Sequence, residues 1–124
     1  MTCNSVKDIL EVKRILNSHK ASLLKLAEET VHLEDTLMPS DRTRPVQMTQ
    51  LLQYSQGDVI PEEISLYVRY QKSRKSISCG MAEKIEKIIN EIASEHKEIS
   101  MEMIRHYLAY VARYVKIREK EEKL

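Results

Sequence analysis

Apolar residues recur with a helical period along the first third of the chain. Seven of them, spaced three, four or seven residues apart, fall on one helical face: Ile9, Val12, Leu16, Leu23, Leu26, Leu33 and Leu37. An apolar period near 3.5 residues is typical of a long amphipathic helix that lies along other helices. His19 and Thr30 lie on the same face and interrupt it with polar groups. We therefore expect one long amphipathic helix over residues 1–37, beginning at about Val6.

The remaining sequence predicts a compact bundle of shorter helices over residues 46–124. The whole chain contains only two glycines and three prolines, and it has no Trp or Phe, which disfavours strands. Residues 38–45 contain two of the prolines and form a predicted linker. Apolar spacing and prolines at first helical positions then predict four helices, at about 45–55, 61–75, 81–96 and 101–120. The expected fold class is all-α, a single helical domain built as a bundle of about five helices.

Several kinds of active site are disfavoured by the residues present. Two glycines cannot build a loop that cradles phosphates, and no GxxxxGK motif occurs. None of the four histidines has a His or Cys three or four residues later, which argues against a zinc site. Glu29 and His32 form one Glu-x-x-His match, whereas a di-metal bundle needs two. We therefore assign no catalytic, metal or cofactor residues and expect a protein that is not an enzyme.

The cysteines and the hydropathy indicate the cellular compartment of the protein. Cys3 and Cys79 do not form a CxxC pair, and we expect both to be free thiols in a reducing cytoplasm. No apolar run approaches the roughly 20 residues that a membrane span needs. The first residues also lack a basic segment followed by an apolar one, so no secretory signal is expected. The sequence predicts a cytoplasmic protein without a membrane partner.

A basic run without acids is the strongest functional signal. Residues 64–82 contain no Asp or Glu, yet they include Arg69, Lys72, Arg74 and Lys75. The net charge of the chain is only +1, so this positive charge is local. A cationic helix face can neutralise nucleic-acid phosphates, and it can equally do no more than complement the helix dipole. The nucleic-acid hypothesis requires these side chains to reach water without being neutralised by acids of adjacent helices.

Two smaller groups of cations extend the candidate surface. Arg113 and Lys116 lie on the last predicted helix among tyrosines, and tyrosines interleaved with arginines can stack bases. Such a tyrosine stripe more often belongs to a core or an interface, and we expect Tyr107 to be a core residue. Arg42 and Arg44 lie in the predicted linker, where a basic loop can become ordered on a nucleic-acid strand.

Residues 43–118 resemble the small helical subunit of type III-A CRISPR effector complexes, the Csm small subunit. That family has a helix ending Tyr-x-x-Gly-Arg, and the similar stretch here is Tyr70-Gln71-Lys72-Ser73-Arg74, with serine in place of glycine. The family's last helix carries an Ala-Tyr-x-Lys-Tyr ending. The similar stretch here, one residue out of step, is Ala109-Tyr110-Val111-Ala112-Arg113-Tyr114. Lys75 also replaces a commonly acidic neighbour, and the predicted helix over residues 1–37 has no counterpart that aligns.

The resemblance implies a function and a set of partners. Family members are non-enzymatic subunits of an antiviral defence ribonucleoprotein. They stack along the effector filament and brace the duplex of guide and target RNA with basic side chains. Arg69, Lys72 and Arg74 would then contact phosphates, with Arg113 and Lys116 as a second tier. The expected partners are RNA and other protein subunits, further copies of this chain included.

Two other interpretations stay open. The helix over residues 1–37 would be a coiled-coil arm that dimerises or docks on a partner protein, with the charged patches only solubilising, and His19 and Thr30 would fix its register. Alternatively, the predicted helices 45–55 and 61–75 would form a DNA-binding helix-turn-helix. Glu62 and Glu63 at the start of its second helix argue against that interpretation, because they would repel phosphate.

Overall fold

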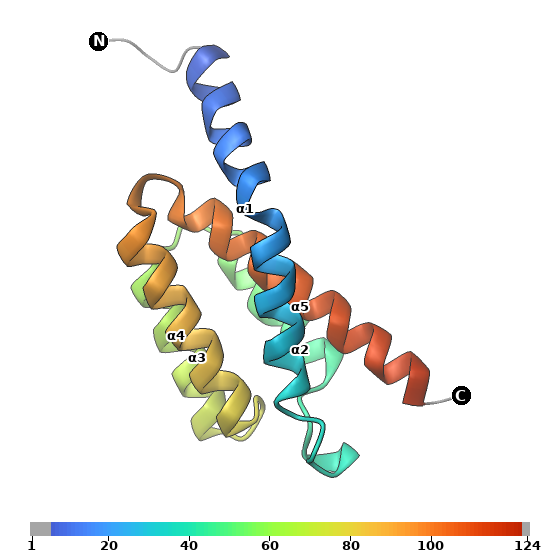
Figure 1. The fold of residues 1–124 in the computed structure, drawn as a ribbon. Helices are drawn as coiled ribbons and strands as arrows, with labels where there is room; N and C mark the ends of the chain where they lie inside the picture. The colour runs from blue at the N-terminus through green and yellow to red at the C-terminus, as the bar shows by residue number, and fades with distance from the viewer. Residues whose placement is uncertain (1–5, 123–124) are drawn as a thin grey trace.

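The computed structural model describes residues 6–122, and five α-helices account for most of them (Figure 1). They are α1 (Val6–His32), α2 (Pro45–Ser55), α3 (Pro61–Ser73), α4 (Cys79–Glu95) and α5 (Ser100–Glu122), with short 3-10 turns at Pro39–Asp41 and Lys97–Ile99. This described part of the chain contains no strand. The predicted all-α fold of about five helices with a long N-terminal helix is confirmed.

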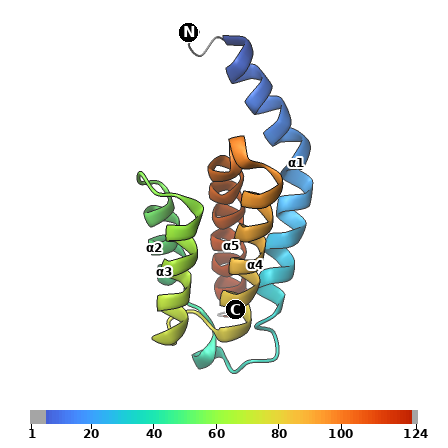
Figure 2. The ribbon, with the colours of Figure 1, turned by 90° about the vertical axis from the view of Figure 1, so that its left-hand side faces the viewer.

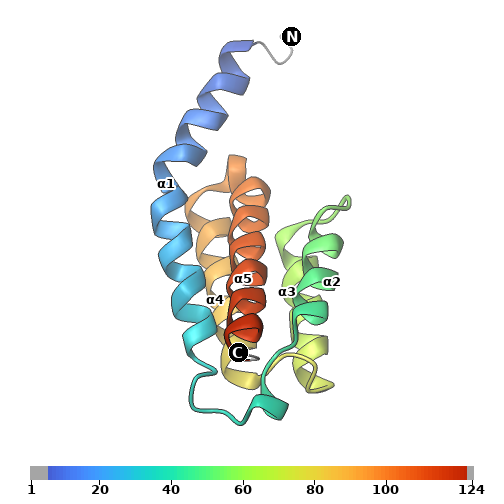
Figure 3. The ribbon, with the colours of Figure 1, turned by 90° about the vertical axis from the view of Figure 1, so that its right-hand side faces the viewer.

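The central element of the bundle is α5. It contacts α1 and α2 most extensively, and it lies between the α2–α3 pair and the helices α1 and α4 (Figures 2 and 3). Its buried residues recur every three or four positions: Met103, Ile104, Tyr107, Leu108, Val111, Ala112 and Val115. On α4 the buried face includes Ile85, Ile88, Ile89 and Ile92. Burying one large apolar side chain contributes about 1.5–3 kcal/mol, so these faces supply the stability of the bundle.

Tyr107 lies in the core, as predicted. Its side chain has no exposed surface, and its hydroxyl shares a hydrogen bond of 2.7 Å with Thr30 Oγ1. Thr30 Oγ1 also donates to the carbonyl oxygen of Leu26, so both buried hydroxyls are satisfied. Burial raises the pKa of Tyr107 well above its usual value. Thr30, one of the two polar residues that interrupt the apolar face of α1, is therefore the partner of a buried tyrosine.

The first helix ends at His32, five residues before the predicted end. Leu33 is 48% exposed, so the last predicted apolar positions do not face the bundle. The buried face instead continues through Ala27, Val31 and Glu34. A straight helix has 3.6 residues per turn and drifts by roughly 20° per heptad from a 3.5-residue repeat. Extrapolating the heptad therefore assigned the wrong side chains to the buried face at this end of α1.

Residues 38–45 connect the region of α1 to α2. Thr43 is buried in this segment, and α1 packs directly on α5. The described residues before and after the predicted linker contribute to one core. Cys79 is a free, exposed thiol, and Cys3 lies outside the described residues. Within residues 6–122, no helix is long and apolar enough to cross a membrane.

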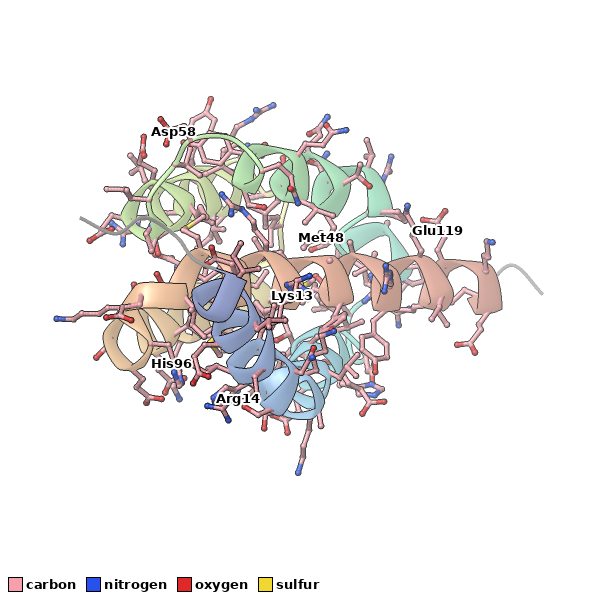
Figure 4. All side chains as sticks on the ribbon, turned by 90° about the horizontal axis from the view of Figure 1, so that it is seen from above. Lys13, Arg14, Met48, Asp58, His96 and Glu119 are labelled. Carbon is pink, nitrogen blue, oxygen red and sulfur yellow. The ribbon has the colours of Figure 1, made fainter. Side chains whose placement is uncertain are left out.

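The beginning of α1 extends past the rest of the bundle in all three ribbon views (Figures 1, 2 and 3). We call residues 9–15 the α1 overhang. Ile9 is 50% exposed and Leu10 is 59% exposed, and from Ile9 onward the first buried side chain is Leu16. Seen from above, Lys13 and Arg14 label this segment where it passes over the helices below (Figure 4). Val12 and Ile15 of the overhang pack partly against the core, whereas Ile9 and Leu10 are exposed to water.

The turn after α3 holds a lysine in an unusual backbone conformation. Lys75 has φ of 63°, and it is the only non-glycine residue with positive φ in the described chain. The amide of Ser76 donates to the carbonyl of Gln71 at 2.9 Å, which closes the helix end. Glycine is the usual residue at such a position, since the left-handed conformation costs other residues about 1 kcal/mol.

A candidate nucleic-acid interface

The predicted basic ridge on α3 is partly neutralised. Arg69 Nη2 lies 3.0 Å from Glu86 Oε1, and Lys72 Nζ lies 2.9 Å from Glu83 Oε2. The hydrogen bond from Lys72 lowers the pKa of Glu83, and the same bond raises the pKa of Lys72. The expectation that these two cations project into water without acidic partners is therefore wrong. Because α3 packs on α4, acids absent from the run itself reach it from the next helix.

The two cations at the end of α3 are exposed. The guanidinium carbon of Arg74 lies 5.5 Å from the centre of the Tyr70 ring, a cation–π contact on the surface. Lys75 follows in the turn. The acids of α4 therefore neutralise only the part of the basic run that faces them.

The cations of α5 divide into two groups. Arg113 and Lys116 are exposed, as a nucleic-acid contact requires. Arg105 and Arg118 serve the fold, since Arg105 Nε donates to the carbonyl oxygen of Ser55 at 2.8 Å and Arg118 Nη1 binds a buried carboxylate. Arg113 and Lys116 do not line the surface that four of the other candidates share, which is described next.

Four of the eight candidate cations line a single cleft of about 920 Å³: Arg42, Arg44, Lys72 and Lys75. We call it the basic cleft. Its walls are the loop before α2, the end of α3 and the first turn of α4, segments that meet at the end of the bundle opposite the α1 overhang (Figure 1). Asp41 is an acid on its lining. The fold thus brings the linker arginines and the α3 lysines, which are distant in sequence, to one place.

The side chain of Arg42 stabilises the loop before α2. Its Nε donates to the carbonyl oxygens of Glu34 and Leu37, each at 3.1 Å, and its Nη1 lies 2.6 Å from Glu122 Oε2. Only 17% of its side chain is exposed. Arg44 is exposed instead. We therefore regard Arg44 and Lys75 as the available cations of the basic cleft, with Lys72 shared between the cleft and Glu83.

A buried carboxylate joins the two walls of the basic cleft. Glu34 is fully buried and accepts hydrogen bonds from the Thr43 amide at 3.1 Å, from Thr43 Oγ1 at 2.6 Å and from Ser78 Oγ at 2.5 Å. Arg118 Nη1 lies 2.9 Å from the same carboxylate, and Arg118 Nη2 donates to the Thr43 carbonyl. Thr43 precedes Arg44, and Ser78 precedes the first turn of α4. Glu34 thereby fixes the loop before α2 relative to the first turn of α4, a role for which the sequence contains no periodic or motif signal.

The first turn of α4 is open toward the basic cleft. Ser78 occupies the N-cap position, but its hydroxyl donates to Glu34 and caps no amide of the helix. Gly80 has no side chain, and a Cβ placed there would meet nothing within 4 Å. The first amides of a helix carry partial positive charge and favour anions. The cleft therefore combines side-chain cations with the N-terminal turn of a helix.

Metal chemistry finds no support in the described part of the chain. No group of three or more His, Cys, Asp or Glu side chains there could hold a metal ion. Glu29 is exposed, and His32 Nδ1 lies 2.7 Å from Asp35 Oδ2 at the surface.

Three comparisons with known proteins, covering protein families, curated proteins and solved structures, find no match for this chain. The resemblance to the Csm small subunit therefore stays a prediction that rests on the residues quoted for it.

Proposed function

We propose that this protein is a non-enzymatic RNA-binding subunit that contacts backbone phosphates through the basic cleft. The observation that carries the proposal is the meeting of Arg44 and Lys75, both exposed, in one cleft with Lys72. The proposal replaces the α3 ridge with a surface formed by three segments. It also accommodates the resemblance to a CRISPR effector subunit, in which basic side chains would brace RNA inside a larger assembly.

The electrostatics of the cleft favour this ligand class. Each lysine or arginine that neutralises a phosphate releases counterions, which makes binding favourable and salt-dependent. The ion pair between Lys72 and Glu83 lies at the surface, where solvent weakens such pairs, so a phosphate can compete for the lysine. The Glu34 hydrogen bonds hold both walls in place before any ligand arrives, which lowers the entropic cost of binding.

The direct test is RNA binding by a variant of the two available cations. Arg44→Ala combined with Lys75→Ala should weaken binding to single-stranded RNA of any sequence. It should also reduce the slope of log affinity against log salt by about 1.4, since each lost phosphate contact on a single strand removes about 0.7. Fluorescence anisotropy at several salt concentrations measures both effects.

The matched control is Lys87→Ala combined with Lys97→Ala. It removes the same charge from two exposed lysines that lie outside the cleft lining. The control should keep both affinity and salt slope. Equal losses in the two variants would show a nonspecific charge effect and would contradict the proposal.

A protein-interaction role is the second candidate, and the α1 overhang favours it. Ile9 and Leu10 are large apolar side chains, and each exposes at least half of its surface. The seven residues of the overhang span about 10 Å, enough for two turns of a coiled coil with another copy of the chain. In this candidate function the overhang joins copies of the protein, and the basic cleft has no role.

A further inference from the structure

The cations that line the basic cleft come from two parts of the chain. Arg44 comes from the loop before α2, Lys72 from the last turn of α3 and Lys75 from the turn that follows. Cations in a groove can contact successive phosphates of a nucleic-acid strand. Because these cations line one cavity, they also suit a single compact anion with more than one negative charge, which a strand carries only at a phosphorylated end.

Two small residues also line this cavity. Ser76 lines it from the turn after α3, and Gly80 lines it from the first turn of α4, where no Cβ obstructs the backbone. A phosphate monoester carries a charge of about −1.5 to −2 near neutral pH and three strong acceptor oxygens. An internal phosphodiester carries a single charge. The lining carries Arg44, Lys72 and Lys75 against one acid, Asp41, and this positive balance suits the more highly charged monoester better.

Lys75 supplies an independent observation. It occupies the left-handed conformation in which glycine would be less strained, yet its side chain lines the cleft. Strained residues persist where the surrounding structure enforces them, and they concentrate at functional sites. A glycine at this position would improve the turn and would remove one cation from the cavity. Stability and anion binding thus favour different residues at position 75.

From these observations we infer that the basic cleft binds a terminal phosphate, a phosphate monoester, in preference to internal phosphodiesters. The inference rests on the proposed function where the monoester is the phosphorylated end of an RNA strand. A small phosphate-bearing metabolite offers the same chemistry, and the experiment below separates the two sources.

The experiment compares RNA oligonucleotides of one sequence that carry a 5′-phosphate, a 3′-phosphate or no terminal phosphate, with adenosine monophosphate as the free monoester. The full chain is titrated with each probe by calorimetry, as wild type and as Lys75→Gly. We expect at least one phosphorylated end to bind the wild type tenfold or more tightly than the unphosphorylated strand. In Lys75→Gly this preference should disappear while Tm rises by about 3 °C, because the turn is relieved of strain.

The outcomes separate the inference from the proposed function. Equal affinity for all three RNAs would overturn the inference and leave RNA binding intact. Binding of the free monoester alone, lost in Lys75→Gly, would support the inference and overturn the RNA function. A preference for a phosphorylated end that persists in both Lys75→Gly and Arg44→Gln would place the site elsewhere and overturn the inference. No binding of any probe would overturn both.

Discussion

Arg118 and Glu34, 84 residues apart in the sequence, form an ion pair of 2.9 Å in which the carboxylate is fully buried. The pair joins the last part of α5 to the turn after α1. Its carboxylate also holds Thr43 and Ser78, whose neighbours form the walls of the basic cleft. The interior of the bundle and the candidate site are therefore connected through one side chain.

Removing Arg118 should destabilise the bundle strongly. In Arg118→Met the Glu34 carboxylate stays buried without its cation, a change that typically costs about 3–5 kcal/mol. Urea denaturation followed by circular dichroism measures the free energy of unfolding. The double variant Arg118→Met with Glu34→Gln removes the unpaired charge and should recover part of the loss. If the double variant loses as much free energy of unfolding as the two single variants lose together, the two residues are not coupled.

Neutralising Glu83 should strengthen RNA binding. In Glu83→Gln the ammonium of Lys72 loses its carboxylate partner at 2.9 Å and becomes available to a phosphate. We expect affinity to rise several-fold at low salt. Glu91→Gln makes the same change of charge at an exposed position of α4 outside the basic cleft, and it should give a smaller increase. If both variants bind alike, Lys72 does not contact the ligand.

Stability should fall at alkaline pH partly because of Tyr107. Burial raises the pKa of Tyr107 in the folded state, while in the unfolded chain it ionises near its usual value of 10.0. Above pH 10 the unfolded state releases this proton first, so stability decreases as pH rises, by at most about 1.4 kcal/mol per pH unit from this group. Tyr107→Phe should flatten the decline in denaturation experiments between pH 9 and 11. Tyr70→Phe is the control, since more than half of Tyr70 is already exposed in the folded state.

The α1 overhang offers a test of self-association. Ile9→Ser with Leu10→Ser should convert any dimer to monomer in sedimentation velocity and leave the helical content unchanged, because both side chains lie outside the core. Removing residues 1–40 would be a poor test of the same idea. That deletion takes away Leu23, Thr30 and Glu34, which are buried in the bundle. A wild-type protein that is already monomeric at high concentration would exclude this role.

The helices could be predicted from the sequence because the features that produce them are local. Prolines at the first positions of α2 and α3 predicted both starts correctly, and the isoleucine spacing of α4 marked its buried face. The end of α1 was not accessible, since it depends on Glu34 turning inward to meet residues far along the chain. Periodicity reports which face of a helix is apolar, and it carries no information on which distant partner a polar residue finds.

The candidate site could be predicted from the sequence only in part, for the same reason. Charge counting identified Arg42, Arg44, Lys72 and Lys75 but assigned them to separate surfaces, and the fold brings them to one cleft. The same counting could not reveal that Glu83 and Glu86, beyond the acid-free run, would lie against it. A run of like charge on one helix predicts a charged surface only when the charges on the neighbouring helix are known.

The position of α5 has a consequence for synthesis of the protein. The helix that contacts all four others is synthesised after them. Until it emerges from the ribosome, α1 and α2 lack the helix with which they make most of their contacts, and Glu34 lacks its arginine. The nascent chain therefore presents partly unprotected hydrophobic helices until α5 has been made, a state in which chaperone binding or association with another subunit would compete with folding.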